Sequence, residues 1–200
     1  MTSIRIAGQD PTTGLATVYY ATVDKSGRVF TNSVAKDARL DASERGRSFI
    51  IHTSFETITT TASYSGLCYI KNTSSNKHIH VSNVRVCTTG SGYVQARLYK
   101  NPTTGTLITG GTAVTVVNTN FESGTTPFDG TAIKGADSLT ITDGTIMENW
   151  TQSAPGNDNQ NFQGAIILGP GNSIGLEVKP SAVGDICTAW QVYVEDSAGL

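Results

Sequence analysis

The alternation of apolar and polar positions in the last forty residues predicts three β-strands. Apolar side chains alternate with polar ones through Ser173–Lys179 and Ile186–Glu195, and an apolar run covers Phe162–Leu168. A period of two is typical of strands, because successive Cβ atoms point to opposite faces of a sheet. Gly169–Asn172 places a proline between two glycines and predicts a tight turn between the first two strands.

The residues of the final strand alternate between two faces of the sheet. Trp190, Val192 and Val194 share one face, and we expect that face to lie in the core. A strand of this length must be paired along its whole extent, because an unpaired edge invites aggregation. The C-terminal pattern therefore indicates a closed or sandwiched sheet.

Short strands separated by polar, glycine-rich stretches continue through the chain from Ser48 onward. We predict strands at Phe49–His52, Phe55–Thr61, Tyr64–Lys71, His78–Thr88, Tyr93–Tyr99, Thr106–Ile108, Thr112–Thr119, Ser138–Thr142 and Thr145–Gln152. The stretches too polar for strands are Asn72–Lys77, Asn120–Gly135 and Ser153–Asn161, and Thr89–Gly92 reads as a turn.

This regular spacing predicts an all-β protein, an antiparallel jelly-roll sandwich preceded by an extended N-terminal arm or hairpin. Eight core strands fit between Tyr64 and Glu195, with the earlier strands added at the edges. An immunoglobulin-like sandwich is the alternative. It is disfavoured because no Cys, Trp, Cys order with suitable spacing is present.

Residues 1–47 differ from residues 48–200, which predicts an N-terminal arm followed by one β-sandwich domain. Leu15–Val23 and Arg28–Val34 flank a turn sequence, Asp24–Gly27, and together predict a hairpin. Lys36–Arg47 is rich in charges of both signs, so it is either a surface linker or an arm ordered against a partner. The candidate contact residues in it are Lys36, Asp37, Arg39, Asp41, Glu44, Arg45 and Arg47.

Composition and charge exclude several classes of partner. The chain has 14 basic and 16 acidic residues, a formal net charge of -2, which gives no electrostatic reason to expect nucleic acid or an anionic membrane. No apolar stretch reaches the roughly 18 residues needed to span a bilayer. The first ten residues lack the apolar core of a secretion signal, which favours assembly in a cytoplasm. Only 15% of positions are charged, against about 25% in ordinary domains, so much of the surface is expected to contact other protein.

The residues that carry chemistry are few. Cys68, Cys87 and Cys187 lie in apolar strand patterns, which favours buried free thiols, although a pair remains open if neighbouring strands align. His78 and His80 share a strand face and form a conceivable metal pair, but surface histidines beside a turn are favoured, and we expect no metal and no cofactor.

Catalytic motifs are not apparent in the sequence. Gly90–Gly92 is not a nucleophile elbow, and the carboxylates fall mostly in turns or at strand ends, whereas a glycosidase needs two carboxylates facing each other across a cleft. An enzyme acting on a polysaccharide is therefore a remote hypothesis. Trp190 is expected in the core and Trp150 is ambiguous, so neither establishes a carbohydrate site.

Six segments in order resemble a group of tailed-bacteriophage virion proteins. They are Val23–Val29, Glu44–His52, Ser65–Asn72, Leu98–Gly105, Lys134–Asp137 and Ala165–Val178. Each segment is common in strand and turn sequences, and the order in which they occur is the stronger signal. The resemblance covers most of the chain from about Val23 onward.

The resemblance implies a jelly-roll structural protein similar to capsid cement or decoration proteins. Such proteins commonly bind the outer surface of a phage head as homotrimers, at junctions between subunits of the major capsid protein. This implies a virion protein assembled in the host cytoplasm, with no catalytic residues. The segment before Ser48 departs from a bare decoration domain, and it leaves open a tail or spike component that binds a host-surface glycan or protein.

Overall fold

The computed structural model of the chain describes residues 2–9, 16–23, 38–121 and 127–196. The chain divides into two compact units, residues 1–36 and residues 37–200. We describe each unit by itself. The second unit begins at residue 37 and so includes residues 38–47, which the sequence pattern assigns to the N-terminal arm.

The first unit contains a two-stranded antiparallel sheet. Strand β1 (Thr2–Gln9) pairs with strand β2 (Ala16–Val23) over eight residues each, with Ile4 opposite Ala21 and Ile6 opposite Tyr19. The partner of β2 is therefore the N-terminal segment. The predicted hairpin paired this strand with Arg28–Val34, which lies outside the described residues together with its turn.

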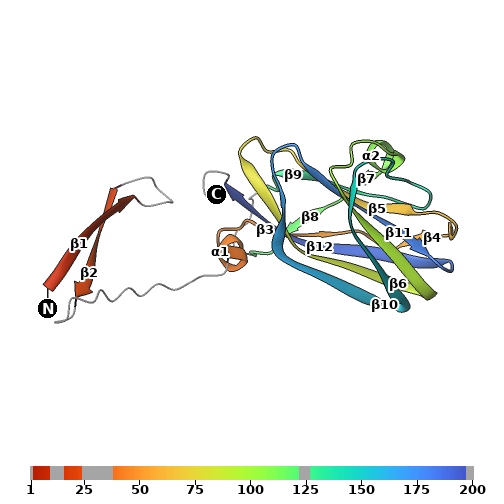
Figure 1. Cartoon of the computed structure of the whole chain (residues 1–200), viewed down its shortest axis with the longest axis horizontal. Helices are drawn as coiled ribbons and strands as arrows, with labels where there is room; N and C mark the ends of the chain where they lie inside the picture. The colour runs from red at the N-terminus through yellow and green to blue at the C-terminus, as the bar shows by residue number, and fades with distance from the viewer. Residues whose placement is uncertain (1, 10–15, 24–37, 122–126, 197–200) are drawn as a thin grey trace. The chain divides into compact units, whose positions relative to one another are not determined.

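The second unit is a single curled, mostly antiparallel sheet (Figure 1). Its elements are α1 (Ala38–Glu44), β3 (Ser48–His52), β4 (Glu56–Ile58), β5 (Ser65–Asn72), β6 (Lys77–Lys100), α2 (Thr106–Gly110), β7 (Thr112–Ala113), β8 (Val116–Asn118), β9 (Gly130–Lys134), β10 (Thr145–Leu168), β11 (Ser173–Pro180) and β12 (Gly184–Asp196). The strands follow the order β7-β9-β5-β11-β6-β12-β3-β8, with β10 paired to β6 and β4 paired to β12. The all-β, antiparallel prediction is confirmed.

Strands β6 and β10 are each 24 residues long and run antiparallel to each other. Strand β6 continues through Thr89–Gly92, and β10 continues through Ser153–Asn161, so the predicted turn and the predicted loop are both wrong. The polar composition of these stretches reflects exposure, because most of the intervening β10 side chains lie at the surface rather than in a core. Strand pairing, not burial, holds them extended.

The other edge of β6 is shared by two strands in succession. Strand β11 pairs with its C-terminal half, where Pro180 lies opposite Val94, and β12 pairs with its N-terminal half, where Ile186 lies opposite Thr88. The predicted strands at the C-terminus and the turn between Leu168 and Ser173 are confirmed.

The sheet curls until its two outer wings meet. The ring of Phe49 in β3 contacts the ring of Phe128, just before β9, with centroids 5.3 Å apart. Lys134 of β9 forms an ion pair with Glu56 of β4, and this pair also connects the two wings. Within this curl lies the larger of two apolar clusters, to which both halves of β6 contribute side chains. Trp190 belongs to it with 1% of its surface exposed, as the alternation in its strand predicts.

Several shorter predictions differ from the structure. Thr106–Ile108 lies in helix α2 rather than in a strand, and Ser138–Thr142 is not a strand. Thr112–Thr119 is divided between β7 and β8, whereas β9 lies inside the predicted Asn120–Gly135 loop. Gly66 of β5 leaves the space that the buried side chain of Leu107 in α2 fills.

Candidate functional site

A β-bulge interrupts β6 at Ser82. Asn83 lies opposite Gln191 and Val81 lies opposite Val192, so Ser82 has no opposite residue in β12. Buried apolar residues of β6 explain the bulge, since Val81 and Val84 are three positions apart and a regular strand would place them on opposite faces. One extra residue restores both to the core. Bulges of this kind redirect side chains and are frequent next to functional sites.

The neighbouring strand β10 departs from regular pairing at the same level. Asn161 lies opposite Asn83 and Ile166 opposite Val81, so the four residues between Asn161 and Ile166 form an excursion. Within it, Gln163 has a φ of 52° and Gly164 a φ of 82°. A side chain at Gly164 would collide with the Tyr193 ring, which explains glycine at this position.

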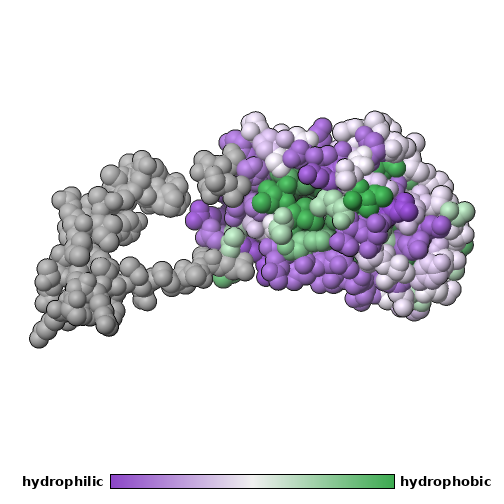
Figure 2. Space-filling model, in the orientation of Figure 1, coloured by the Kyte–Doolittle hydropathy of each residue, from purple (hydrophilic) through white to green (hydrophobic). Residues whose placement is uncertain are grey.

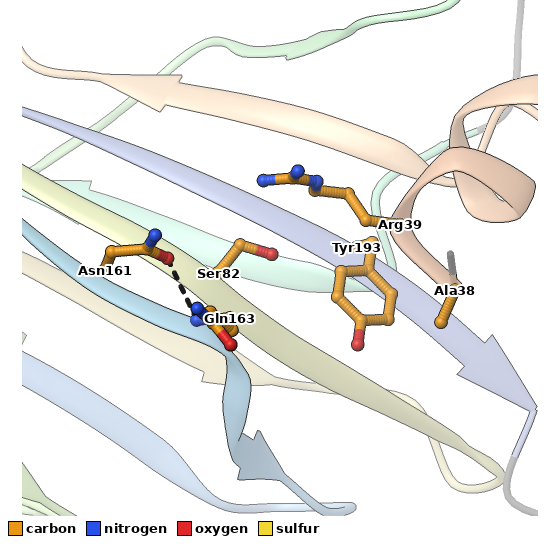
Figure 3. Close-up of a pocket in the computed structure, with 6 residues that line it drawn as sticks. All are labelled: Ala38, Arg39, Ser82, Asn161, Gln163 and Tyr193. Atoms are coloured by element: carbon orange, nitrogen blue, oxygen red, sulfur yellow. Dashed lines mark hydrogen bonds between the residues drawn. The ribbon is translucent and has the colours of Figure 1, made fainter. Parts of the chain in front are cut away.

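The two irregularities and helix α1 enclose a depression of about 420 Å³, which we call the bulge pocket. It is lined by Ala38, Arg39, Ser82, Asn161, Gln163 and Tyr193 (Figure 3). The backbone N–H of Gln163 donates to Oδ1 of Asn161 at 3.1 Å, which fixes that amide on one side. Ser82 projects from β6 at the base, and Arg39 reaches over the sheet from α1 (Figure 3).

The outer face of the sheet continues from the bulge pocket into a second depression of about 380 Å³, which we call the amide groove. The register places Arg85 between Ala189 of β12 and Asn159 of β10, one row beyond the bulge. The groove is lined by Ile50, Asn83, Arg85, Asn157, Asn159, Ala189, Trp190 and Gln191. Amides and a guanidinium therefore dominate its polar groups, and none of the described carboxylates lines it.

His80 lies buried beside the bulge pocket. Its ring stacks on Tyr193 at 4.6 Å with 9° between the planes, and its Nδ1 donates to the carbonyl of Gly164 at 3.2 Å. Its Nε2 lies 3.3 Å from Oε2 of Glu195. The prediction of a surface histidine is wrong for His80, which is 4% exposed, because the β10 excursion covers it. Within the described residues no group of three or more His, Cys, Asp or Glu side chains is arranged to hold a metal ion.

Two of the three cysteines lie opposite each other on neighbouring strands. Cys187 of β12 lies opposite Cys87 of β6, and all three thiols are free, as the sequence pattern favours. Burial and, to a smaller extent, the neighbouring Cys87 raise the pKa of the Cys187 thiol to about 11. The third thiol, Cys68, is fully buried, and burial raises its pKa as well.

An apolar surface lies on the open side of the curl. Strand β10 bends in its middle and its two arms spread from the bend (Figure 1), and Figure 2 shows hydrophobic surface between them. Met147 from one arm and Ile167 from the other line one depression of about 280 Å³. Ile146, Met147 and Ile167 are each more than 40% exposed. We call these three residues the seam patch.

The strand that frames the seam patch is itself an edge. Within the described residues, β10 pairs with β6 along one side, and no strand pairs with its other side. A 24-residue edge therefore presents backbone donors and acceptors beside exposed apolar side chains. The unpaired backbone groups of such an edge have the geometry to pair with a strand of another chain.

The residues predicted to contact a capsid are distributed over several environments. Arg39 lines the bulge pocket, Asp41 of α1 pairs at 2.8 Å with Arg45, the residue after the helix, and Arg47 pairs with Asp196 at 2.8 Å. The carbonyl of Glu44 accepts a bond from the Asn120 amide at 3.0 Å. Lys36 and Asp37 lie outside the described residues.

The structure identifies residues that sequence analysis missed, above all Ser82, Asn161 and Gln163 of the bulge pocket. Spacing holds the relevant signal: apolar positions in β6 shift from odd to even numbers between Val81 and Val84, and such a shift indicates a bulge. The seam patch had no equivalent signal, because it depends on how β10 bends.

Comparisons with known proteins identify no family to which the chain is similar. No protein-family model matches the chain, and none of the curated proteins matches it. Among solved structures, a chain of "Structure of infectious bursal disease virus Gt strain" is 17% identical, and the match covers 99% of this chain and 49% of that one with a TM-score of 0.11. The chain thus spans about half the length of that protein. At this TM-score the likeness carries no argument.

Proposed function

We propose that the chain is a non-enzymatic structural protein of a bacteriophage virion, a cement or decoration protein that binds the outer surface of the head as a homotrimer. The observation that carries the proposal is the seam patch on the unpaired edge of β10. The proposed partners are the major capsid protein and further copies of the chain. No cofactor, nucleic acid or membrane is needed for this role.

The seam patch supports self-association on physical grounds. Contiguous exposed apolar surface on a soluble protein marks an interaction site, and long unpaired edges are normally covered or blocked. Met147 and Ile167 come from opposite arms of β10, so any surface that covers the seam patch contacts both arms at once. In a three-fold arrangement, each patch packs against its two neighbours around the axis and all three are covered together.

We interpret the curled sheet as a jelly roll in this role. Strands β6 and β10 run through the bend and contribute to both halves of the sheet, and Phe49 and Phe128 bring the two wings together. A jelly roll has two such facing halves joined by long connections. This architecture leaves its outer faces available for neighbouring proteins.

The chemistry of the described carboxylates favours a non-enzymatic role. Hydrogen bonds from hydroxyl and backbone groups outweigh the effect of burial and lower the pKa of Asp137 to about 2. Hydrogen bonds from Thr103 and Thr104 lower the pKa of Asp143 to about 2 as well. A general acid needs a raised pKa, and these two carboxylates instead act as acceptors that fasten loops.

The N-terminal unit is the proposed attachment element for the head. Its sheet has two strands, β1 and β2, and a two-stranded sheet alone is marginally stable in water. Binding to a capsid subunit supplies the missing packing surface. Three such arms in a trimer raise the effective concentration of each arm once the first has bound.

Membrane association has no part in the proposal. Across the described ranges, none of the helices is both long and apolar enough to traverse a bilayer.

The test is the copy number and position of the chain on purified particles of the phage that encodes it. We expect on the order of hundreds of copies, placed as trimers on the outside of the head. Quantitative mass spectrometry of the particles measures the number, and cryo-electron microscopy measures the position. Between three and about eighteen copies, placed at the tail, would replace this proposal with the alternative of a tail or spike component.

A further inference from the structure

Cys87 and Cys187 form a pair of opposed thiols on two central strands of the sheet. Cys187 of β12 lies directly opposite Cys87 of β6 in the antiparallel register, and both thiols are free. Residues that lie directly opposite in an antiparallel pair project from the same face, with Cβ atoms about 4.5–5.5 Å apart. Their two side chains therefore lie next to each other.

The backbone spacing at this pair matches that of a disulfide. Opposite residues of an antiparallel ladder have Cα atoms about 4.5 or 5.5 Å apart, depending on whether the pair shares backbone hydrogen bonds. A disulfide joins Cα atoms that are about 4.4–6.8 Å apart. A bond between the two sulfurs therefore requires rotation of two side chains and little displacement of either strand.

The two thiols are close enough for the ionisation of one to depend on the other. Burial contributes most to the raised pKa of the Cys187 thiol, and the charge of Cys87 and a hydrogen bond with its side chain also raise it. The third thiol has no such neighbour in the register, since Cys68 of β5 lies opposite Leu176 on one side and Lys134 on the other. The chain thus contains one cysteine pair and one isolated cysteine.

The two thiols of the pair differ in their access to solvent. Cys87 is half-buried, whereas Cys187 is 4% exposed. A dissolved oxidant therefore reaches Cys87, and Cys187 reacts through its neighbour. This difference assigns the two cysteines separate roles in an oxidation.

The position of the pair gives a bond between its sulfurs a mechanical effect. Ile186 and Thr88 form the next opposite pair and the last one of the β6–β12 ladder. Beyond it the same edge of β6 pairs with β11, where Val94 lies opposite Pro180. A covalent bond at the cysteine pair therefore ties the first residues of β12 to β6, at the point where β6 changes partner.

We propose that Cys87 and Cys187 form a redox site at which a low-molecular-weight disulfide, such as oxidised glutathione, converts two thiols into a cross-strand disulfide that locks β12 to β6. The Cys87 thiolate attacks one sulfur of the oxidant, and one glutathione leaves as a thiolate. The Cys187 thiolate then attacks Sγ of Cys87 and displaces the second glutathione thiolate. The protein loses two electrons and two protons, and the oxidant takes up both and becomes two thiols.

Proximity compensates for the small fraction of Cys187 that is ionised near neutral pH. The second step is intramolecular, and a group held beside its target has a very high effective concentration. A reducing cytosol keeps such thiols free, and an oxidising medium outside the cell favours the disulfide. This inference goes beyond the structural role proposed above and does not depend on it, because the chemistry requires only the paired strands.

The experiment incubates the reduced full chain with oxidised and reduced glutathione, the oxidised form in about tenfold excess, and then blocks remaining thiols with iodoacetamide in denaturant. Peptide mapping by mass spectrometry without reduction is expected to find Cys87 joined to Cys187 in most molecules, with Cys68 alkylated. Electrophoresis without reducing agent is expected to show single chains. Absence of the joined peptides would overturn the proposal, as would a bond between two chains.

Two variants separate the steps. In Cys187→Ala the second step has no attacking thiol, so a mixed disulfide of Cys87 with glutathione is expected to accumulate. Cys68→Ala is the matched control, because it also removes a buried thiol but leaves the pair intact, and it is expected to form the disulfide at the wild-type rate. Circular dichroism checks that both variants are folded. Cys87 left unmodified in folded Cys187→Ala would contradict its role as the first nucleophile.

The effect on stability tests the lock itself. The disulfide closes a loop of roughly 100 residues, and a crosslink over a long loop restricts the unfolded chain strongly. The oxidised wild type is expected to unfold about 5–10 °C above the reduced form, whereas Cys187→Ala is expected to gain nothing from the same treatment. Thermal unfolding by circular dichroism measures both. An unchanged or lower transition temperature in fully linked protein would show that the disulfide does not lock the two strands.

Discussion

The Phe49 ring meets the Phe128 ring edge to face, with 5.3 Å between their centroids. Phe49 belongs to β3 at one wing of the sheet, and Phe128 precedes β9 at the other. The pair therefore joins two parts of the curled sheet that are not neighbours in strand order. The free energy of unfolding that is lost when this contact is removed measures how much the contact contributes to closing the curl.

Replacement of Phe49 by alanine is expected to destabilise the fold by about 3–5 kcal/mol, because a side chain 2% exposed leaves a cavity. Urea unfolding followed by fluorescence measures the change. Phe55→Ala is the matched control, since Phe55 is 53% exposed, and its effect is expected to stay within about 0.5 kcal/mol. Similar small losses for both variants would show that the wings are not closed at Phe49.

Stability is expected to decrease as the pH falls from about 4 to 2, because two carboxyl groups fasten loops in their ionised form. The pKa of Asp137 is lowered from 3.8 to about 2, so its stabilising effect is complete above 3.8 and is lost as the pH approaches 2. The bond from the Thr60 N–H to Oδ1 of Asp137, at 3.1 Å, is the kind of contact that disappears.

Asp137→Asn tests this pH dependence. The variant is expected to be less stable than the wild type at about pH 5 and to lose less further stability between about pH 4 and pH 2. Urea midpoints at several pH values measure both. The same decrease in wild type and variant over this interval would mean that Asp137 is not the responsible group.

Removal of residues 1–36 is expected to leave a folded sheet unit, whereas removal of residues 1–47 is expected to destabilise it. The longer deletion takes away α1, whose Ala42 is 3% exposed, and the Arg47 carbonyl that accepts a bond from the Val194 N–H at 2.9 Å. Thermal unfolding by circular dichroism compares the two forms. Equal transition temperatures would show that α1 does not support the sheet.

Cys187 is expected to react slowly with iodoacetamide at about pH 8. Its pKa of about 11, raised by burial and by Cys87, leaves few thiolate anions, and the thiolate is the reactive form. We expect a rate about two orders of magnitude below that of an unhindered cysteine with a pKa near 8.5. Peptide mapping by mass spectrometry measures the rate at each cysteine, and a rate equal to that of an unhindered thiol would contradict this environment.

Local patterns in the sequence predicted much of the sheet. The alternation of Trp190, Val192 and Val194 identified a core strand, and the turn before Ser173 followed from its glycines and proline. Both features depend on neighbouring residues alone. Strand β10 was harder, because its polar middle, Ser153–Asn161, has the composition of a loop and is held extended by pairing with β6.

The candidate sites were less accessible from the sequence for the same reason. Met147 and Ile167 are far apart along one strand and line one depression because that strand bends. Similarly, Arg39 was predicted as a contact residue in the charged segment, but its position over Ser82 depends on the packing of α1 against the sheet. Contacts between distant segments follow from the whole fold, and the alternation of residues within one strand does not predict them.

Self-association through the seam patch is the central claim, and the mass of the full chain in solution tests it most directly. By sedimentation equilibrium at micromolar concentration, the wild type is expected to have three times the 21.1 kDa monomer mass. Ile167→Glu places a charge in the seam patch and is expected to be a folded monomer. Val117→Glu changes an apolar residue of β8 that is 53% exposed, and it is expected to remain trimeric. A monomeric wild type, or a trimeric Ile167→Glu, would contradict the account.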